Sequence, residues 1–198
     1  ELNTLKKITQ PLPDFYEARA ASVEQILSNT YSNMQFSKSE QDYWLHKNEQ
    51  VQTPIEYGYT QGWTKFLNQI EFFVFVLLVI VIAIAPVFAN EYQTGAHQII
   101  LSTKFGKTKL ILAKLFTAFV FGLVVLTVHF VMMLILVAFT FGLDGAALPV
   151  QALHNTNPYD WTVGRFVAVQ VVTVYALLFG LIGITLWLSA KVKSAFVA

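Results

Sequence analysis

The chain has 198 residues, of which 55% are hydrophobic and 13% charged, and its formal net charge at pH 7 is +1. Soluble domains carry about 25% charged residues, so this composition argues against a soluble protein, and the nearly neutral charge gives no reason to expect a nucleic-acid partner. The chain contains no cysteine, which excludes a disulfide framework and a thiolate metal site.

Residues 1–65 form the first predicted region, a small segment of short helices and loops. Between residues 15 and 27 the apolar side chains recur at roughly helical spacing. Ser37 and Glu40 fit a capping box at the start of a second helix. The stretch TPIEYGYTQGW, residues 53–63, is predicted to be an irregular aromatic loop. We expect the region to serve either as a connector that packs on the membrane domain or as a cap that contacts substrate or a partner.

Three apolar runs follow, at about residues 70–89, 115–141 and 165–190. Each is about as long as the roughly 20 helical residues needed to cross the hydrocarbon core of a bilayer. From Phe116 to Phe141, and again from Phe166 to Ala190, there is no Asp, Glu, Lys or Arg. Pro86 is expected to kink or end the first run. The sequence therefore predicts an all-α integral membrane protein, with a transmembrane domain over residues 66–198.

The charges of the loops predict the orientation of the three spans. Residues 90–115 hold four lysines and one glutamate, a net of +3, whereas residues 142–165 hold one arginine and two aspartates, a net of −1. Because positive loops stay in the cytoplasm, the first loop and the C-terminus are predicted to lie inside, and residues 1–65 to be extracytoplasmic. No apolar signal segment precedes the first run, so we expect a further membrane helix ahead of this chain in the full protein.

The polar stretch between the first two runs, residues 90–114, carries the functional signal. From residue 90 to residue 101 the apolar positions 92, 96, 99 and 100 follow one face of a helix. We therefore predict one short amphipathic helix along the inner membrane surface, followed by a basic turn. Gly106-Lys107-Thr108 is similar to the end of a phosphate-binding P-loop, but Leu101 stands where that loop needs its first glycine. Nucleotide binding by this chain is not predicted.

This stretch, FANEYQTGAHQIILSTKFGKTKLILAKL, resembles the first cytoplasmic loop of ABC-2 type permeases, the membrane subunits of a class of ABC transporters. The family pattern is an acidic residue, Thr-Gly or Gly-Thr, a run of Leu or Ile, a small polar turn, a basic residue and a lysine entering the next helix. The positions that match this pattern are Glu91, Thr94-Gly95, Ile99-Ile100-Leu101, Ser102-Thr103, Lys107 and Lys114. The family often has Pro and Arg in the turn, where this chain has Phe105 and Lys107.

The resemblance implies six membrane helices, three of them in this chain, and a coupling helix that docks on a separate ABC ATPase subunit. ATP and Mg²⁺ would belong to that partner, so neither a cofactor or metal nor a catalytic residue is expected in this chain. A second permease subunit, identical or different, would complete an exporter in the cytoplasmic membrane. The residues expected to contact or transmit force from the ATPase are Glu91, Tyr92, Thr94, Gly95, His97, Gln98, Ile99, Leu101, Ser102, Lys104 and Lys107.

Four of these residues have more specific expectations. Glu91 is the candidate for a salt bridge or a helix cap at the joint between span and loop. Gly95 is expected either to permit close packing or to be a weak point in the helix. Lys104 and Lys107 are expected to meet anionic lipid head groups in preference to the ATPase, with contact to the ATPase as the alternative.

Polar and small residues inside the spans are further candidates. His129 and Gln170 lie in apolar runs, where a polar group either serves function or hydrogen-bonds to another helix. Small residues spaced four apart permit close helix contacts, within one subunit or across a dimer. These residues are Ala118 and Gly122 in the second span, and Ala176 and Gly180, with Gly183 one turn on, in the third.

Two other functions remain open. An intramembrane enzyme would need paired carboxylates, a histidine cluster or a Ser/His arrangement, but the four histidines are predicted at different depths and cannot share a metal. A membrane sensor or regulatory subunit would bind a ligand with its outer segment and signal through the inner loop. The substrate of a transporter is not identified by any motif in the sequence.

Overall fold

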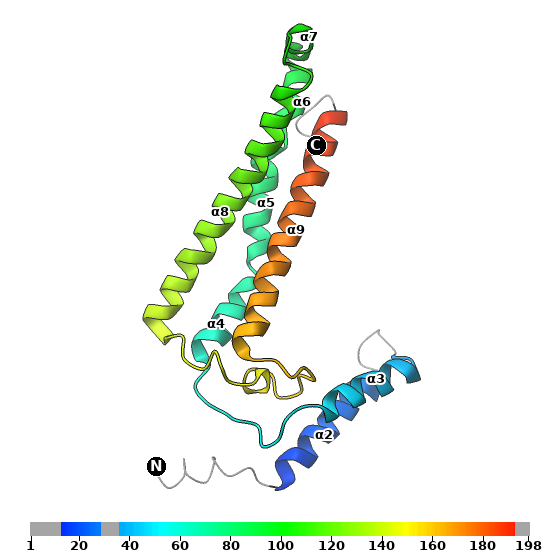
Figure 1. The fold of residues 1–198 in the computed structure, drawn as a ribbon, viewed down its shortest axis with the longest axis vertical. Coiled ribbons are helices and arrows are strands. Elements are labelled where there is room, and N and C mark those ends of the chain that lie inside the picture. Colours follow the sequence, from blue (N-terminus) through cyan, green and yellow to red (C-terminus); the bar gives the residue numbers. More distant parts are fainter. Residues whose placement is uncertain (1–12, 29–35, 193–198) are drawn as a thin grey trace. The chain divides into compact units, whose positions relative to one another are not determined.

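The computed structural model describes residues 13–28 and 36–192, and the regular elements within these ranges are helices (Figure 1). Among the described residues, three helical stretches are long and apolar enough to cross a membrane. The prediction of an all-α membrane protein with three spans in this chain is confirmed, and the protein is a multi-pass membrane protein. The parts of the predicted outer segment at residues 1–12 and 29–35 lie outside the described residues. The stretches that could span are Gln61–Gln93, Lys109–Phe141 and Val163–Lys191.

The chain divides into two compact units. Unit 1 comprises residues up to 64 together with residues 142–168, and unit 2 comprises residues 65–141 together with those from 169 onward. The loop after the second span therefore belongs to the same compact unit as the N-terminal helices. In chain order the helices are α2 (Pro13–Ser28), α3 (Lys38–Glu49), α4 (Gln61–Ile70), α5 (Phe73–Ile84), α6 (Pro86–Gln93), α7 (Ala96–Ser102), α8 (Lys109–Phe141), the 3-10 helix η1 (Val150–Ala152) and α9 (Val163–Lys191).

The capping box predicted at the start of α3 in unit 1 is present. The N–H of Glu40 donates to the Ser37 hydroxyl at 3.4 Å, and the N–H of Ser37 donates to the Glu40 carboxylate at 2.7 Å. The Ser37 hydroxyl also donates to this carboxylate, and these hydrogen bonds, the one from the hydroxyl first, hold the pKa of Glu40 below its ordinary value. The start of α3 is thus determined locally by its sequence.

Arg19 of α2 joins the N-terminal helices of unit 1 to the loop at 142–168. Its buried guanidinium donates to the carbonyls of Asn155, at 2.8 Å, and Asn157, at 3.4 Å. Burial lowers the pKa of Arg19. The Tyr57 hydroxyl donates to the Asn155 side chain at 3.0 Å, and so binds the same loop from the segment before the first span. These bonds connect parts of the chain that lie more than 90 positions apart.

The first span is built from three consecutive helices, α4, α5 and α6. It begins at Gln61, earlier than the predicted start at residue 70, so the aromatic loop ends before it reaches Trp63. The prediction missed α4 because that helix mixes polar side chains with apolar ones and is less hydrophobic than α5. Pro86 begins α6 and separates it from α5, as expected for a residue that has no N–H and clashes with the preceding turn.

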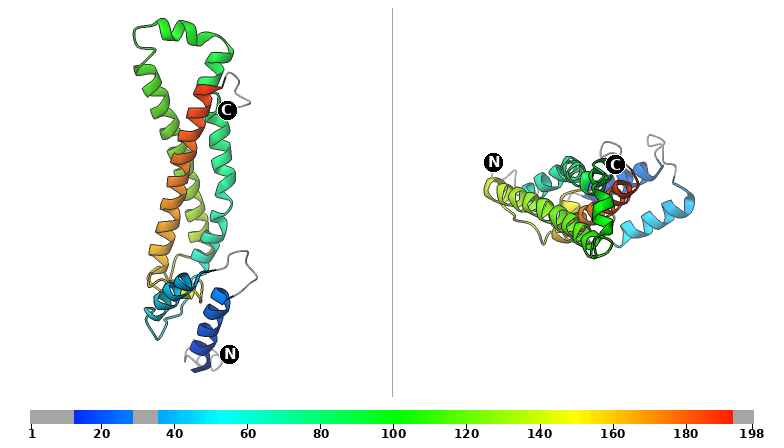
Figure 2. Two further views of the ribbon diagram at one scale, coloured as in Figure 1. Left: turned by 90° about the vertical axis from the view of Figure 1, so that its right-hand side faces the viewer. Right: turned by 90° about the horizontal axis from the view of Figure 1, so that it is seen from above.

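The spans of unit 2 pack closely around Gly122 of α8, and α5, α8 and α9 run alongside one another there (Figure 2). A Cβ atom at Gly122 would lie 2.6 Å from Cδ1 of Ile182 and 3.4 Å from Cγ2 of Ile80. Both isoleucines are fully buried. The close contact predicted for Ala118 and Gly122 is therefore formed within this chain, because the missing side chain admits neighbours from two other helices.

Candidate functional site

The predicted coupling stretch folds as two helices joined by a left-handed residue. α6 ends before Thr94, α7 begins at Ala96, and Gly95 between them has φ 74° and ψ 0°. The prediction of one continuous amphipathic helix over residues 90–101 is therefore wrong. A glycine adopts this conformation at little cost. The helical spacing of the apolar residues suggested one helix, because this spacing does not reveal a break of the backbone at a single residue.

Gly95 is used for its backbone conformation and not for close packing. A Cβ atom placed there would meet no atom within 4 Å. The chain turns at this residue, so that α6 continues the first span while α7 forms a separate short helix between α6 and α8 (Figure 2). Neither expectation for Gly95, close packing or a weak point within a helix, describes its role.

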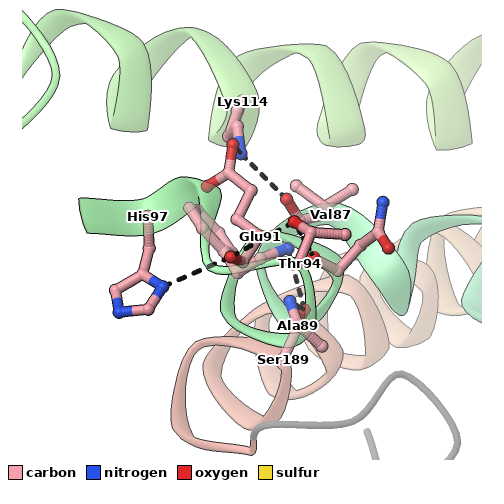
Figure 3. Close-up of polar contacts among 9 residues, drawn as sticks. Val87, Ala89, Glu91, Thr94, His97, Lys114 and Ser189 are labelled. Carbon is pink, nitrogen blue, oxygen red and sulfur yellow. Dashed lines mark hydrogen bonds and ion pairs between the residues drawn. The ribbon is translucent and has the colours of Figure 1, made fainter. Parts of the chain in front are cut away.

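Glu91 of α6 and Lys114 of α8 form an ion pair, drawn in Figure 3. Their side chains are 24% and 19% exposed, so the pair is screened by solvent less than one on an open surface. The Lys114 ammonium also donates to the carbonyl of Val87 at 2.9 Å and lies 5.0 Å from the ring centroid of Phe88. The salt bridge expected for Glu91 is present, and it links the end of the first span to the start of the second.

Ser189 of α9 links the third span to the same place. Its fully buried hydroxyl accepts hydrogen bonds from the N–H groups of Phe88 and Ala89, both at 3.0 Å, and donates to the carbonyl of Ala85 at 2.6 Å. The first N–H groups of a helix have no partner within that helix, and α6 has no side-chain cap of its own. Ser189 supplies the cap from another helix.

Sequence reasoning did not single out Ser189, although a signal was available. A proline inside a span frees backbone groups that cannot bond to water in hydrocarbon, and hydroxyl side chains of neighbouring helices commonly satisfy them. The kink at Pro86 was predicted from the sequence. Which hydroxyl group satisfies the freed backbone groups depends on which helices pack together, and these helices lie about 100 residues apart in the chain. We call these contacts the joint: the ion pair of Glu91 and Lys114 links α6 to α8, and the hydrogen bonds of Ser189 link α6 to α9.

Several of the predicted coupling residues stabilise the turn at Gly95. Nδ1 of His97 lies 3.3 Å from the carbonyl oxygen of Glu91, and its ring centroid lies 4.7 Å from that of Tyr92 (Figure 3 shows the first contact). The hydroxyl of Thr94 donates to the carbonyl of Asn90 at 2.8 Å. The remaining predicted residues are all exposed: Gln98, Ile99, Leu101, Ser102, Lys104 and Lys107.

The candidates inside the spans do not join this site. His129 is exposed and its ring packs edge-on against Phe73, with centroids 4.9 Å apart. Gln170 is half-buried. Unlike Gly122, the small residues of the third span lie on an exposed face, and a Cβ atom at Gly180 or Gly183 would meet nothing within 4 Å.

No protein-family model, curated protein or solved structure matches the chain.

The arrangement of Glu91, Lys114 and Ser189 is suited to mechanical linkage. Among the described residues, no group of three His, Cys, Asp or Glu side chains could hold a metal ion. Glu91 is neutralised by Lys114, and Ser189 is fully engaged with backbone groups. The joint connects α6, α8 and α9 next to the short helix α7.

Proposed function

We propose that this chain is the membrane subunit of an ABC-2 type transporter, in which α7 receives movement from a partner ATPase and the joint passes it to the spans. The observation that carries the proposal is the Glu91–Lys114 ion pair at the base of α7. The resemblance of residues 88–115 to the coupling loop of that family supports the same function. ATP hydrolysis belongs to the partner, and the chain contributes to export of a substrate across the cytoplasmic membrane.

The predicted coupling residues divide into two groups with different tasks. Glu91, Tyr92, Thr94 and His97 hold α6 and α7 in a fixed geometry. The exposed group offers a contact surface, within which Ile99 is 73% exposed. Exposed apolar side chains on a short helix outside the membrane spans mark a candidate contact with another protein. A surface displaced by the ATPase would move the rigid turn, and the joint would carry that motion to α8 and α9.

Co-purification from the native host tests this proposal. The tagged full chain, extracted in mild detergent, is expected to bring down an ABC ATPase subunit. Ile99→Ala is expected to lose this partner, because it removes the most exposed apolar side chain of α7. Ile82→Ala is the matched control, since Ile82 is 71% exposed but lies in the middle of a span. Wild-type protein that purifies without an ATPase, or an Ile99→Ala variant that retains it, would contradict the proposal.

A membrane sensor is the second candidate, and one observation favours it. Unit 1 contains an apolar pocket of about 260 Å³ between α2, α3 and the loop before α9. Its walls include Val23, Leu27, Trp44 and Tyr159. A hydrophobic ligand that binds unit 1, in a protein that recruits no ATPase, would favour this function over transport.

A further inference from the structure

A cavity of about 340 Å³ lies beside the joint, entirely within unit 2. Its walls come from α6, α7, α8 and α9 and are largely apolar; they include Phe88, Leu115, Phe119, Gly183 and Trp187. Cavities of roughly 300 Å³ and more are the size of small-molecule sites. Transmission of force through the joint needs packed side chains and does not explain an apolar hollow at this position.

The cavity lies at the end of two spans. Its lining residues on α8 belong to the first turns of that helix, and those on α9 belong to the last turns. Trp187 is 58% exposed, and the ammonium of Lys191 lies 4.5 Å from its ring centroid. Tryptophan and lysine at the end of a membrane helix are typical of the level where hydrocarbon meets lipid head groups. The cavity is therefore placed where an acyl chain and its head group could both be reached.

The surroundings of the cavity are basic. Residues 86–114 and 187–192 hold five lysines and one glutamate, a net of +4. That glutamate, Glu91, is paired with Lys114. Within the described part of the chain, the other four lysines have no acidic partner within 4 Å. Gly106 and Leu110 line the cavity, and Lys109 lies between them in the chain.

We propose that this cavity binds an anionic phospholipid, with an acyl chain between α8 and α9 and the phosphate held by Lys109 and Lys191. Apolar walls, with lysines that adjoin the lining residues Leu110 and Ala190 in the chain, complement a molecule that carries a chain and a negative head group. A cationic amphiphile is disfavoured, because the one carboxylate of the site is already neutralised. A lipid in this place contacts α6, α7, α8 and α9 together and so stabilises the joint. The inference requires only the spans and the cavity, and does not rest on the proposed function.

Two glycines of α9 provide a matched test. A Cβ atom at Gly183 or at Gly180 meets no atom within 4 Å, so neither position obstructs the start of a side chain, but only Gly183 lines the cavity. The full chain is placed in nanodiscs of dioleoyl phosphatidylglycerol and dioleoyl phosphatidylcholine in equal amounts, and the lipids retained after release are counted by native mass spectrometry. We expect wild type and Gly180→Leu to retain phosphatidylglycerol, and Gly183→Leu to retain at least about tenfold less.

A charge variant and a second filling variant complete the test. The double variant Lys109→Gln, Lys191→Gln is expected to lose the preference for phosphatidylglycerol over phosphatidylcholine. Leu115→Trp fills the cavity from α8 and is expected to reproduce Gly183→Leu, which guards against a folding defect of the latter. The proposal is overturned if the filling variants retain as much phosphatidylglycerol as Gly180→Leu. It is equally overturned if wild type retains both lipids alike, or if glycerol phosphate without acyl chains displaces the lipid.

Discussion

Ser189 donates a hydrogen bond to the carbonyl of Ala85, at 2.6 Å, across the proline break of the first span. Ala85 is the cap residue of α6 and has no side-chain oxygen, and the next residue is Pro86, which has no N–H. The backbone of this break therefore depends on a hydroxyl from another helix. The third span supplies it, and in doing so fixes α9 to the first span beside the ion pair of Glu91.

Ser189→Ala is expected to lower the free energy of unfolding by about 1–3 kcal/mol, because it leaves a buried carbonyl and buried N–H groups without this partner. Thr185→Ala is the control. Thr185 is also buried and lies one turn away, but its hydroxyl donates only to the carbonyl of Leu181 in its own helix. We expect Thr185→Ala to cost less than about 1 kcal/mol. Unfolding in mixed detergent micelles measures both, and equal losses would show that the bridge to Ala85 adds no stability.

Charge reversal at Glu91 is expected to uncouple the protein without preventing its insertion. In Glu91→Lys two ammonium groups face each other between α6 and α8, so the end of the first span is no longer held to the start of the second. The complex with the proposed ATPase partner, reconstituted in vesicles, is expected to lose coupled ATP hydrolysis by at least about tenfold. Membrane fractionation checks insertion. Normal coupled activity in this variant would show that the ion pair does not transmit force.

Exchange of the two charges separates the ion pair from the other contacts of Lys114. In Glu91→Lys, Lys114→Glu the pair is restored, but a carboxylate at position 114 cannot donate to the carbonyl of Val87 as the ammonium does. We therefore expect partial recovery of coupled activity. A double variant as inactive as Glu91→Lys alone would indicate that the bond to Val87, and not the ion pair, is the essential contact.

Gly95→Ala is expected to cost about 1–2 kcal/mol, because a Cβ atom strains the left-handed backbone even though no neighbour obstructs it. Gly95→Asn is expected to cost less, since asparagine adopts this conformation more readily. Gly180→Ala is the control, because Gly180 lies in open space within a regular helix, where alanine is favoured by up to about 1 kcal/mol. Detergent unfolding and proteolysis of the turn report the differences. If all three variants behave alike, the left-handed turn is not what selects glycine.

Local features of the sequence were sufficient to predict much of this fold. The three apolar runs, the kink at Pro86 and the capping box at Ser37 each depend on residues that are close together in the chain. An ion pair of Glu91 could be predicted for a related reason. A short connection brings an acid at the end of one span close to a lysine at the start of the next.

Contacts between residues far apart in the chain could not be predicted from the sequence. Nothing near Ser189 indicates that it bonds to Ala85, and nothing near Arg19 indicates that it binds carbonyls more than 130 positions later. The break at Gly95 was missed because a single glycine within apolar spacing is compatible with a continuous helix and with a turn. The left-handed backbone of Gly95, with φ 74°, shows that the chain forms the turn.

The two small-residue pairs show the same limit, and they give a further prediction. The sequence signal is equal for Gly122 and Gly180, but only Gly122 has neighbours close enough to exclude a side chain. Gly122→Val is therefore expected to lower the free energy of unfolding by about 1–3 kcal/mol through overpacking against Ile182. Gly180→Val is expected to fall within about 1 kcal/mol of wild type. The comparison fails if both variants unfold alike in detergent.

The absence of cysteine allows the membrane orientation to be tested with single-cysteine variants. Glu56 and Asp160 are exposed and belong to the same compact unit, so both must face the same side of the membrane. Gln98 is exposed on α7, which is separated from Glu56 by the first span and from Asp160 by the second. A membrane-impermeant maleimide is expected to label Glu56→Cys and Asp160→Cys in intact cells, and Gln98→Cys only after permeabilisation, because the loop around α7 carries the excess of lysines. Labelling of Gln98→Cys in intact cells would place α7 outside the cytoplasm and would contradict the proposed coupling to an ATPase.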